Sequence, residues 1–403
     1  WRLERATLGA QLAAVQLSAS HGLGHRIENL KVLARWQRQA DGWQLTVPTL
    51  QIDGEVMDRL QVRQGEVLQV RSPAFSAGPW LQLLALSDRV PLSTRRWLQA
   101  ARPQVQVGAV HWQGDPSGHW RGSAQLNEVA FASVGGAPGL SGLGGSLEAD
   151  AHGMAVRLDP ARKARLDWPR GFGVEHLLHL DGEIALWPQG GGWHVGTSAL
   201  RVDGTDYAAW IRGGAEFQGD GSRPKLNLAA ALDDAPITAA RRFWIRSMMS
   251  PGAIAWLDEA LVAGQLRHGY GLVSGDLDDW PFIERNGLFQ AGGRIADGQV
   301  HFADGWADLA GVDASVTFQG NGFDMRGSGN LGGVSVPSFS AGIARFDRPE
   351  LAVRASGSGE AGNLLDLLRG SPLQQDHGAT LQALSASGPV QVAFALDRAL
   401  YRN

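Results

Sequence analysis

Residues 240–282 read ARRFWIRSMMSPGAIAWLDEALVAGQLRHGYGLVSGDLDDWPF, and this stretch contains the clearest change from helical to strand periodicity in the chain. Ser250 can cap a helix and Pro251 suits its first turn. Apolar residues then recur at three- and four-residue steps until Gly264, which predicts one amphipathic helix. The residues that follow alternate in short pieces broken by Gly and Asp, as strands and turns do. A short helix therefore interrupts a long run of strands.

The composition is that of a folded, glycine-rich β protein. The 403 residues include 54 glycines with no Gly-X-Y period, which excludes collagen, and 44% hydrophobic residues, which argues against disorder. The formal net charge of −4 gives no electrostatic footprint for nucleic acid, so no such partner is expected. Because the chain has no cysteine, disulfides, thiolate catalysis and cysteine-based zinc sites are excluded.

The ends of the chain suggest a piece of a longer protein. It begins with Trp1 rather than Met and stops at Asn403 just after a strand-like run. Its most apolar segment, 79–86, is far shorter than the roughly 20 residues that a membrane span requires. We expect a β segment closed by short helices at 1–103, a β-meander module ending in the amphipathic helix at 104–265, and a second β module with a short helix at 362–369 over residues 266–403.

Strict alternation of apolar and polar residues marks several expected strands. In VDASVTFQ, residues 312–319, every even position is apolar and every odd position is polar. The same pattern recurs more softly at 226–232 and 390–396. A sheet of such strands has one face that contacts water and one that does not. The apolar face must therefore be covered.

The expected helices are too few to cover that face. A strand adds about 4.8 Å to the width of a sheet and a helix covers about 10 Å. The sequence predicts roughly twenty strands, but helices only at 78–102, where Pro91 separates two of them, at 251–263 and at about 362–368. Either two sheets fill a core between them, or one long sheet curls and leaves an apolar trough. Periodicity alone does not choose between these arrangements.

Motifs for catalysis, cofactors or metals are weak. The pattern G-x-G-x-x-G at 357–362 lies between an expected strand and helix, but no second parallel strand ending in an acid follows, so a glycine-rich turn is expected. The match at 327–332 opens no helix and is expected to be a loop. His176 and His179 lie on an expected strand, where they point to opposite sides. We therefore expect no catalytic residue, no metal and no cofactor.

Several stretches, in order, resemble the YhdP-like branch of the AsmA-like family of Gram-negative envelope proteins. The first is the segment around the amphipathic helix, 248–282, with NGLFQA at 286–291 and ADGWADLAGVDASV at 303–316. The others are 168–187 with the following GWHV, the small-residue hairpin PGLSGLGGSLEADAHGMAVRL at 138–158, and GNLLDLL at 362–368 with the later Ser387-Gly388-Pro389. The resemblance runs from about Phe75 onward.

The resemblance implies a mainly β fold in which a long, curled antiparallel sheet forms an elongated U-shaped apolar groove, with a few short helices at its edges or inside it. Family members are anchored in the inner membrane and extend through the periplasm. It therefore implies a non-enzymatic conduit that carries phospholipid between the inner and outer membranes, with acyl chains as the bound partner and both membranes reached through regions outside this piece. Partners among envelope proteins stay open. The chain departs from the family pattern because it lacks the N-terminal membrane helix and much of the length.

The groove lining expected from the alternation and the resemblance consists of small, branched or aromatic residues, which give a smooth surface without charges. The expected lining residues are Val105, Val107, Leu226, Leu228, Phe289, Ala291, Ile295, Val300, Phe302, Val312, Ala314, Val316, Phe318, Val390, Val392 and Phe394.

Two other functions fit the same strands. One is a β-rich envelope scaffold or spacer with a closed core. The other is a β-solenoid carbohydrate-active enzyme whose exposed Trp residues stack on sugars. The three hypotheses differ in what contacts the apolar face, which is lipid only in the first.

Overall fold

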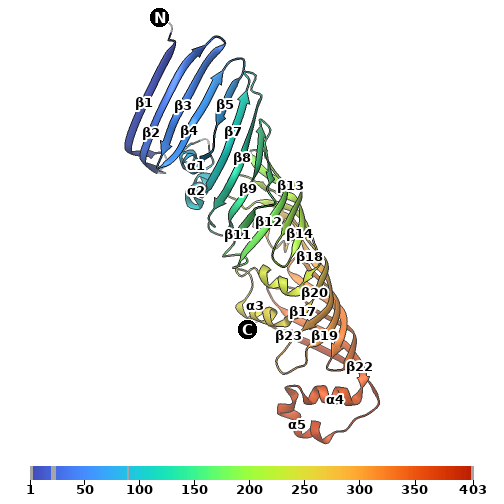
Figure 1. Ribbon diagram of the computed structural model, residues 1–403. Helices are drawn as coiled ribbons and strands as arrows, with labels where there is room; N and C mark the ends of the chain where they lie inside the picture. The colour runs from blue at the N-terminus through green and yellow to red at the C-terminus, as the bar shows by residue number, and fades with distance from the viewer. Residues whose placement is uncertain (1–2, 20–23, 89, 401–403) are drawn as a thin grey trace. The chain divides into compact units, whose positions relative to one another are not determined.

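The computed structural model describes residues 3–19, 24–88 and 90–400 (Figure 1). Its strands are hydrogen-bonded in a 23-stranded sheet, and the strand pairs within it are antiparallel. The prediction of a mainly β chain with a long antiparallel sheet and short helices is confirmed. The chain forms two compact units, unit 1 (residues 1–202 and 214–224) and unit 2 (residues 203–213 and 225–403). The three segments expected from the sequence stay a prediction.

Unit 1 is a meander in which most strands pair with the next one along the chain. Between β9 and β12 lie two short strands, β10 and β11, which both pair with these neighbours and together replace one long strand. The elements are β1 (Arg5–Ser18), β2 (Gly24–Gln39), β3 (Gly42–Ile52), β4 (Glu55–Gln64), β5 (Leu68–Ser72), β6 (Phe75–Ser76), α1 (Gly78–Leu84), α2 (Leu92–Ala101), β7 (Gln104–Gly114), β8 (Trp120–Phe131), β9 (Gly139–Asp150), β10 (Met154–Leu158), β11 (Lys163–Asp167), β12 (Glu175–Gln189) and β13 (Gly192–Asp203).

Unit 2 continues with the same order of pairing. β15 and β16 both pair with β17, and each later strand pairs with the one before it, up to β23. β14 (Ala208–Phe217) has residues in both units. The other elements are β15 (Lys225–Leu232), β16 (Ala235–Pro236), the 3₁₀ helix η1 (Ile237–Phe243), α3 (Pro251–Ala260), β17 (Leu261–Asp276), the 3₁₀ helix η2 (Leu277–Asp279), β18 (Leu288–Val300), β19 (Leu309–Gln319), β20 (Gly322–Leu331), β21 (Val334–Ile343), β22 (Glu350–Glu360), α4 (Ala361–Arg369), α5 (Leu373–Ala383) and β23 (Pro389–Ala399).

Helix α3 begins where the sequence predicts and ends earlier. The Ser250 hydroxyl accepts a hydrogen bond from the backbone N–H of Ala253 at 3.2 Å, and Pro251 is the first helical residue. The predicted end near Gly264 is wrong, because Leu261 already pairs with Val300 as the first residue of β17. Strand pairing therefore replaces the last turn of the expected helix.

The remaining helices match the sequence in part. α1 and α2 are the two helices expected around Pro91, and α4 is the late helix. α5 was not predicted, because Leu381 is its only buried residue and Gly378 lies in its interior.

The expectation of a loop at 327–332 is wrong, since most of these residues belong to β20. The motif at 357–362 runs from the antiparallel strand β22 into α4, which is not the parallel setting of a dinucleotide site.

Candidate functional site: an apolar face on each unit

One apolar row of side chains crosses ten paired strands of unit 1, from β1 to β12. Each member lies directly opposite the next in the strand register. Residues in such positions share a face of the sheet, with Cβ atoms about 5 Å apart. The row is therefore a continuous surface. Its members are Ala6, Trp36, Leu45, Val62, Val70, Trp112, Gly122, Ala149, Met154 and Leu186.

The two rows that flank it point to the opposite face, because side chains alternate along a strand. Over eight paired strands, each flanking row contains only polar residues. The sheet of unit 1 therefore has one apolar face and one polar face. The first row is Arg5, Gln37, Gln44, Arg63, Gln69, Gln113, Arg121 and Asp150, and the second is Thr7, Arg35, Thr46, Gln61, Arg71, His111, Ser123 and Glu148.

Aromatic packing on the apolar row depends on a glycine. The indole of Trp112 stacks on that of Trp120 with ring centroids 6.4 Å apart. A Cβ at Gly122, which is paired with Trp112, would lie only 3.2 Å from Cδ1 of that indole. Glycine at this position therefore lets the ring lie flat against the next strand.

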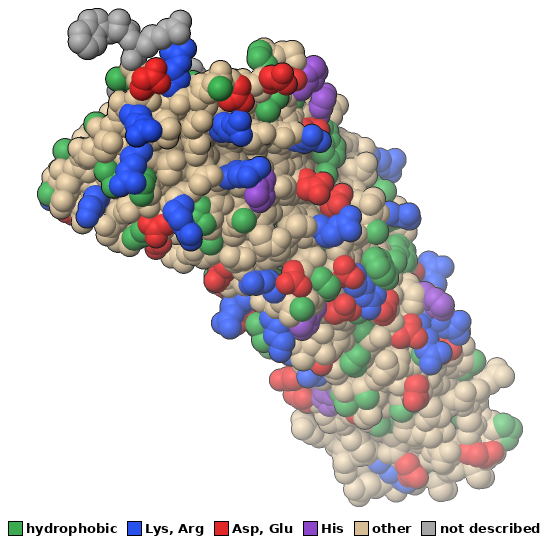
Figure 2. Space-filling view, turned by 45° about the horizontal axis from the view of Figure 1, so that its top comes forward, with side chains coloured by type: hydrophobic (Ala, Val, Ile, Leu, Met, Phe, Trp, Pro, Cys, Tyr) green, Lys and Arg blue, Asp and Glu red, His purple; other side chains and the backbone are tan. Residues whose placement is uncertain are grey.

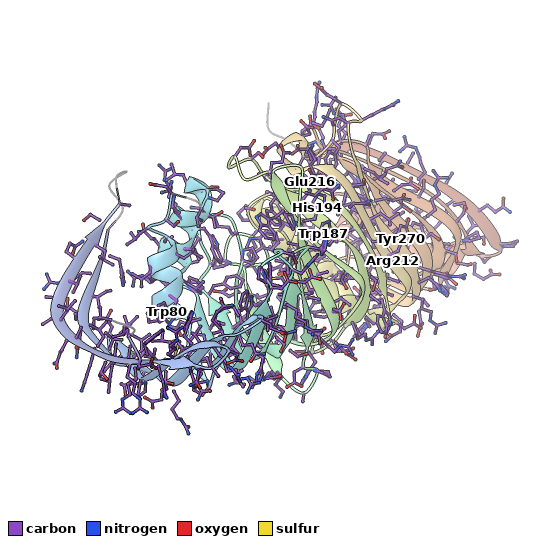
Figure 3. The ribbon with its side chains drawn as sticks, turned by 90° about the horizontal axis from the view of Figure 1, so that it is seen from above. Trp80, Trp187, His194, Arg212, Glu216 and Tyr270 are labelled. Atoms are coloured by element: carbon purple, nitrogen blue, oxygen red, sulfur yellow. The ribbon has the colours of Figure 1, made fainter. Side chains whose placement is uncertain are left out.

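Helix α1 lies against the apolar side of the first strands. Pro79 and Trp80 at its beginning line a small hollow together with Leu50, Ile52 and Met57 of β3 and β4. Figure 3 shows Trp80 between the helices and these strands. One end of the apolar face of unit 1 is thus covered by the protein itself.

A second apolar row crosses the eight strands from β16 to β23 in unit 2. On the six strands from β18 to β23, the residues two positions along on the same face are also apolar. The first row is Ala235, Leu266, Ile295, Ala314, Gly327, Phe339, Ala355 and Phe394, and the second is Gly293, Val316, Met325, Ala341, Val353 and Leu396.

The row between these two points to the other face, and its arginines form ion pairs with neighbouring aspartates. It contains Arg294, Arg326 and Arg354, with serines on the strands between them. Arg294 binds Asp313 through two hydrogen bonds of 2.9 and 2.7 Å, and Arg326 and Arg354 form ion pairs with Asp324 and Asp397 at 2.8 and 2.7 Å. Figure 2 shows positive and negative side chains mixed on the molecular face in view.

The expected lining residues fall on these strands as follows. Ile295, Ala314 and Phe394 belong to one row and Val316 to the next. Ala291 lies opposite Phe318, and both Leu228 and Phe289 are paired with Val273 of β17. Of the others, Val300 is opposite Leu309, Val312 opposite Gly298, Leu226 opposite Gly275, Val390 opposite Gly359 and Val392 opposite Gly357, while Val105 and Val107 lie on β7 of unit 1 opposite Val129 and Leu126.

Phe302 is the exception, because it lies outside the strands. It follows β18, and its carbonyl accepts a hydrogen bond of 3.1 Å from the indole N–H of Trp256 in α3. Its ring contacts that of Trp306. Phe302 therefore joins α3 to the edge of the sheet.

Exposure differs strongly along the face of unit 2. Val312 and Ala314 are 0% and 2% exposed, in a cluster with Ile295 and with Ile237 of η1. Phe394 on the outermost strand is 55% exposed. η1 thus closes the part of the face around Ile295, Val312 and Ala314, whereas Phe394 on β23 is open to solvent.

The two histidines of β12, His176 and His179, have different surroundings. His176 is buried and contacts the ring of Phe172 at 5.1 Å, whereas the Nδ1 atom of His179 lies 3.1 Å from the carbonyl oxygen of Pro160. β11 and β12 pair here without a register shift, so side chains alternate and these two, three residues apart, point to opposite sides of β12, as expected. Across residues 3–19, 24–88 and 90–400, no group of three or more His, Asp or Glu side chains could hold a metal ion.

Comparison with known proteins gives the family. The family model described as YhdP protein matches residues 2–403. The chain belongs to the YhdP family. A relative named "Intermembrane phospholipid transporter YhdP", from Escherichia coli strain K12, is 24% identical over 212 residues. This YhdP match covers 51% of the chain and 17% of the relative, so the chain spans a small part of that protein's length. No solved structure matches.

For this member of the YhdP family, sequence reasoning missed the apolar row of unit 1. The signal was present in Leu60-Gln61-Val62-Arg63 and Leu68-Gln69-Val70-Arg71, which repeat one alternating pattern on β4 and β5. β4 itself was not predicted. Among the helices that the structure describes, none is long and apolar enough to cross a membrane.

Proposed function

We propose that this chain is part of a non-enzymatic conduit that carries phospholipid through the periplasm between the inner and outer membranes. The observation that carries the proposal is the pair of apolar rows that run without a charge across ten strands of unit 1 and eight of unit 2. Membership of the YhdP family supports it, because a relative in that family is named an intermembrane phospholipid transporter.

Apolar area alone can hold such a cargo. Each methylene removed from water contributes about 0.8 kcal/mol, so a lipid with two acyl chains needs no ion pair to stay bound. Transport also requires that no position holds the lipid tightly. The small residues of the rows, such as Ala314, Ala341 and Ala355, give a surface of this kind.

The exposure of the rows indicates where lipid would first make contact. Phe318 and Leu396 are each 36% exposed and Phe394 is 55% exposed, whereas Val312 is fully buried beside Ala314 and Ile295. We therefore propose that acyl chains occupy the exposed parts of the face, around Phe318 of β19 and around Phe394 and Leu396 of β23, in this conformation. Contact with Val312 or Ala314 requires movement of η1, which carries Ile237.

Photo-crosslinking tests which face contacts lipid. A photoreactive residue at Val316 or Phe318 should capture lipid in cells, and the same residue at Ser315 or Thr317 should not, because neighbours on a strand point to opposite faces. Equal labelling at all four positions contradicts the proposal. The purified chain, extracted and analysed by mass spectrometry, should also yield phospholipid.

A matched pair of substitutions on β23 gives a second test. Phe394→Asp places a charge on the apolar face, opposite Ala355, and should reduce the lipid recovered with the protein. Ala393→Asp places the same charge one residue away, on the polar face opposite Ser356, and should not. Two variants with equal lipid content rule out selective contact with this face.

The packed cluster around Ile295 supports a second candidate, a scaffold with a closed core. That function predicts no phospholipid in the extract and no labelling on either face.

For the conduit, we propose periplasmic localisation, with anchoring in the inner membrane through a helix outside this chain. Fractionation of cells that contain the full-length protein tests the anchoring.

A further inference from the structure

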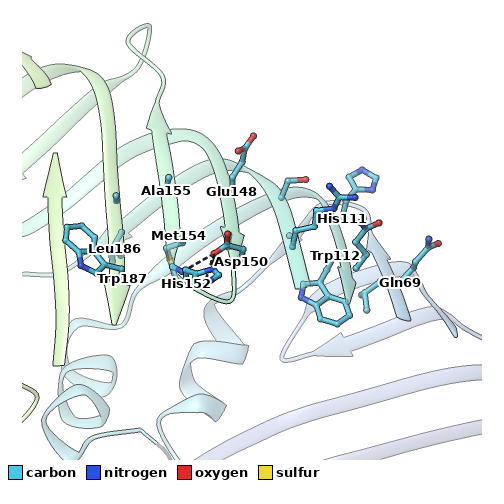
Figure 4. Close-up of a pocket in the computed structure, with 18 of the residues that line it drawn as sticks. Gln69, His111, Trp112, Glu148, Asp150, His152, Met154, Ala155, Leu186 and Trp187 are labelled. Carbon is cyan, nitrogen blue, oxygen red and sulfur yellow. Dashed lines mark hydrogen bonds and ion pairs between the residues drawn. The ribbon is translucent and has the colours of Figure 1, made fainter. Parts of the chain in front are cut away.

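The polar face of unit 1 contains a hollow of about 830 Å³ (Figure 4). Its lining spans six strands, from β5 to β12. It includes the members of the two polar rows that flank Val70, Trp112 and Ala149. It includes none of the apolar residues two positions further along, such as Val110 and Leu147. The hollow is therefore on the face opposite the apolar row.

One register row in this hollow has no partners within the protein. Arg71, His111, Ser123 and Glu148 lie side by side on four strands. Over the described parts of the chain, none of these four side chains forms a hydrogen bond or an ion pair with another residue. On the polar face of unit 2, by contrast, arginines such as Arg294 pair with aspartates. The hollow thus presents unpaired donors and acceptors to solvent.

The charges of the lining balance. The lining contains two arginines, Arg71 and Arg121, and two acids, Glu148 and Asp150, so the hollow favours neither an anion nor a cation. The Asp150 carboxylate accepts hydrogen bonds from the backbone N–H groups of His152 and Gly153 at 2.8 and 3.2 Å, and the first of these bonds is the main reason that its pKa is lowered. A ligand that suits this lining is neutral and both donates and accepts hydrogen bonds.

An aromatic ring lies at one end of the hollow. Trp187, on β12, is 37% exposed and stacks on His194 with centroids 5.5 Å apart and an interplanar angle of 19°. Its Nε1–H donates to the side chain of Gln189 at 3.2 Å. Figure 3 shows Trp187 and His194 next to each other. These contacts hold the indole in place as a flat apolar surface among polar groups.

From this combination, we propose that the hollow binds a neutral glycan of two or three sugar units. A sugar ring has an apolar C–H face that suits an indole, and its hydroxyls both donate and accept hydrogen bonds. The volume lies within the usual range of sites for small molecules, roughly 300–1,000 Å³. Because the site is on the other side of the strands from the apolar row, glycan and lipid would not compete.

The test is calorimetric titration of the purified chain with two neutral trisaccharides, tri-N-acetylchitotriose, as a cell-wall type glycan, and maltotriose, as a hexose glycan. We expect binding of one of them, which identifies the type of sugar that the hollow accepts. Trp187→Ala and Glu148→Gln should each weaken binding roughly tenfold. Trp193→Ala is the control, because Trp193 is also exposed but adjoins His194 on the strand and points to the other face.

Two results would overturn the glycan site. One is the absence of binding of both oligosaccharides up to about 10 mM, which is weaker than the affinity of a built site. The other is equal weakening by Trp187→Ala and Trp193→Ala. Circular dichroism confirms that each variant is folded. Phospholipid recovered with Trp187→Ala should match the unmodified chain, so that failure of the glycan site and failure of the lipid conduit are separate results.

Discussion

Arg294 and Asp313 form a two-bond ion pair across β18 and β19, with Nε–Oδ1 at 2.9 Å and Nη2–Oδ2 at 2.7 Å. The hydrogen bonds from Arg294 hold the pKa of Asp313 below its usual 3.8. A carboxylate whose folded-state pKa is lowered stabilises the fold above its unfolded pKa, and this contribution is lost as the pH falls through the folded value. The pair therefore stabilises the fold at neutral pH, and this contribution is lost in acid.

We predict that Asp313→Asn lowers the urea midpoint at pH 7 and that the difference from the unmodified chain shrinks below about pH 3. Asp181→Asn is the control, because Asp181 is exposed on β12 and its side chain bonds no other residue in the described ranges. A difference between Asp313→Asn and the unmodified chain that grows toward low pH would contradict the assignment.

His301 should titrate above its usual pKa. Its Nδ1 lies 2.8 Å from Asp308 and its Nε2 3.4 Å from Asp304, and the hydrogen bond to Asp308 is the main cause of the raised pKa. Protonation should therefore stabilise the loop below about pH 6.5, and this contribution should be lost as the pH rises through the folded-state pKa. NMR titration should show a larger decrease of the His301 pKa in Asp308→Asn than in Asp304→Asn. Equal decreases would show that the shorter contact does not dominate.

Gly264 should not tolerate a side chain. Its φ is +129°, and a Cβ there would lie 2.7 Å from the Cα atom of Gly298 on the neighbouring strand. Gly264→Ala should therefore destabilise the fold by about 1–3 kcal/mol. Gly252 in α3 has open space around it, and Gly252→Ala should stabilise the fold by about 0.5 kcal/mol. Urea unfolding of both variants measures the two changes in the free energy of unfolding. The changes would not differ in sign if β17 and β18 were not paired at Gly264.

Ile237 should control access to the buried end of the apolar face. Ile237→Ala removes the side chain through which η1 packs on Ile295 and Ala314, and should destabilise the fold by about 2–5 kcal/mol. Lipid crosslinking at Ala314 should rise in this variant. Ile283→Ala, at a position that is 58% exposed, should change neither quantity. Unchanged crosslinking in Ile237→Ala would show that η1 is not the cover.

Local signals in the sequence were sufficient for the elements that depend on few residues. Ser250 and Pro251 define the beginning of α3, and the alternation at 312–319 defines a strand with one apolar side. The end of α3 could not be predicted, because Leu261 is held in β17 by Val300, a residue far along the chain. α5 gave no signal, because a helix with one buried residue has no apolar periodicity.

By itself, the sequence determined that the chain is mainly β and that its strands have an apolar and a polar side, since alternation along a strand is a local property. Only the tertiary structure decided which residues share a row, such as Ile295 with Phe394, and which of them η1 covers. Register is set by hydrogen bonds between strands, and a shift of one residue in a pairing exchanges the two faces. The positions of the apolar row, the polar hollow and Trp187 follow from that register.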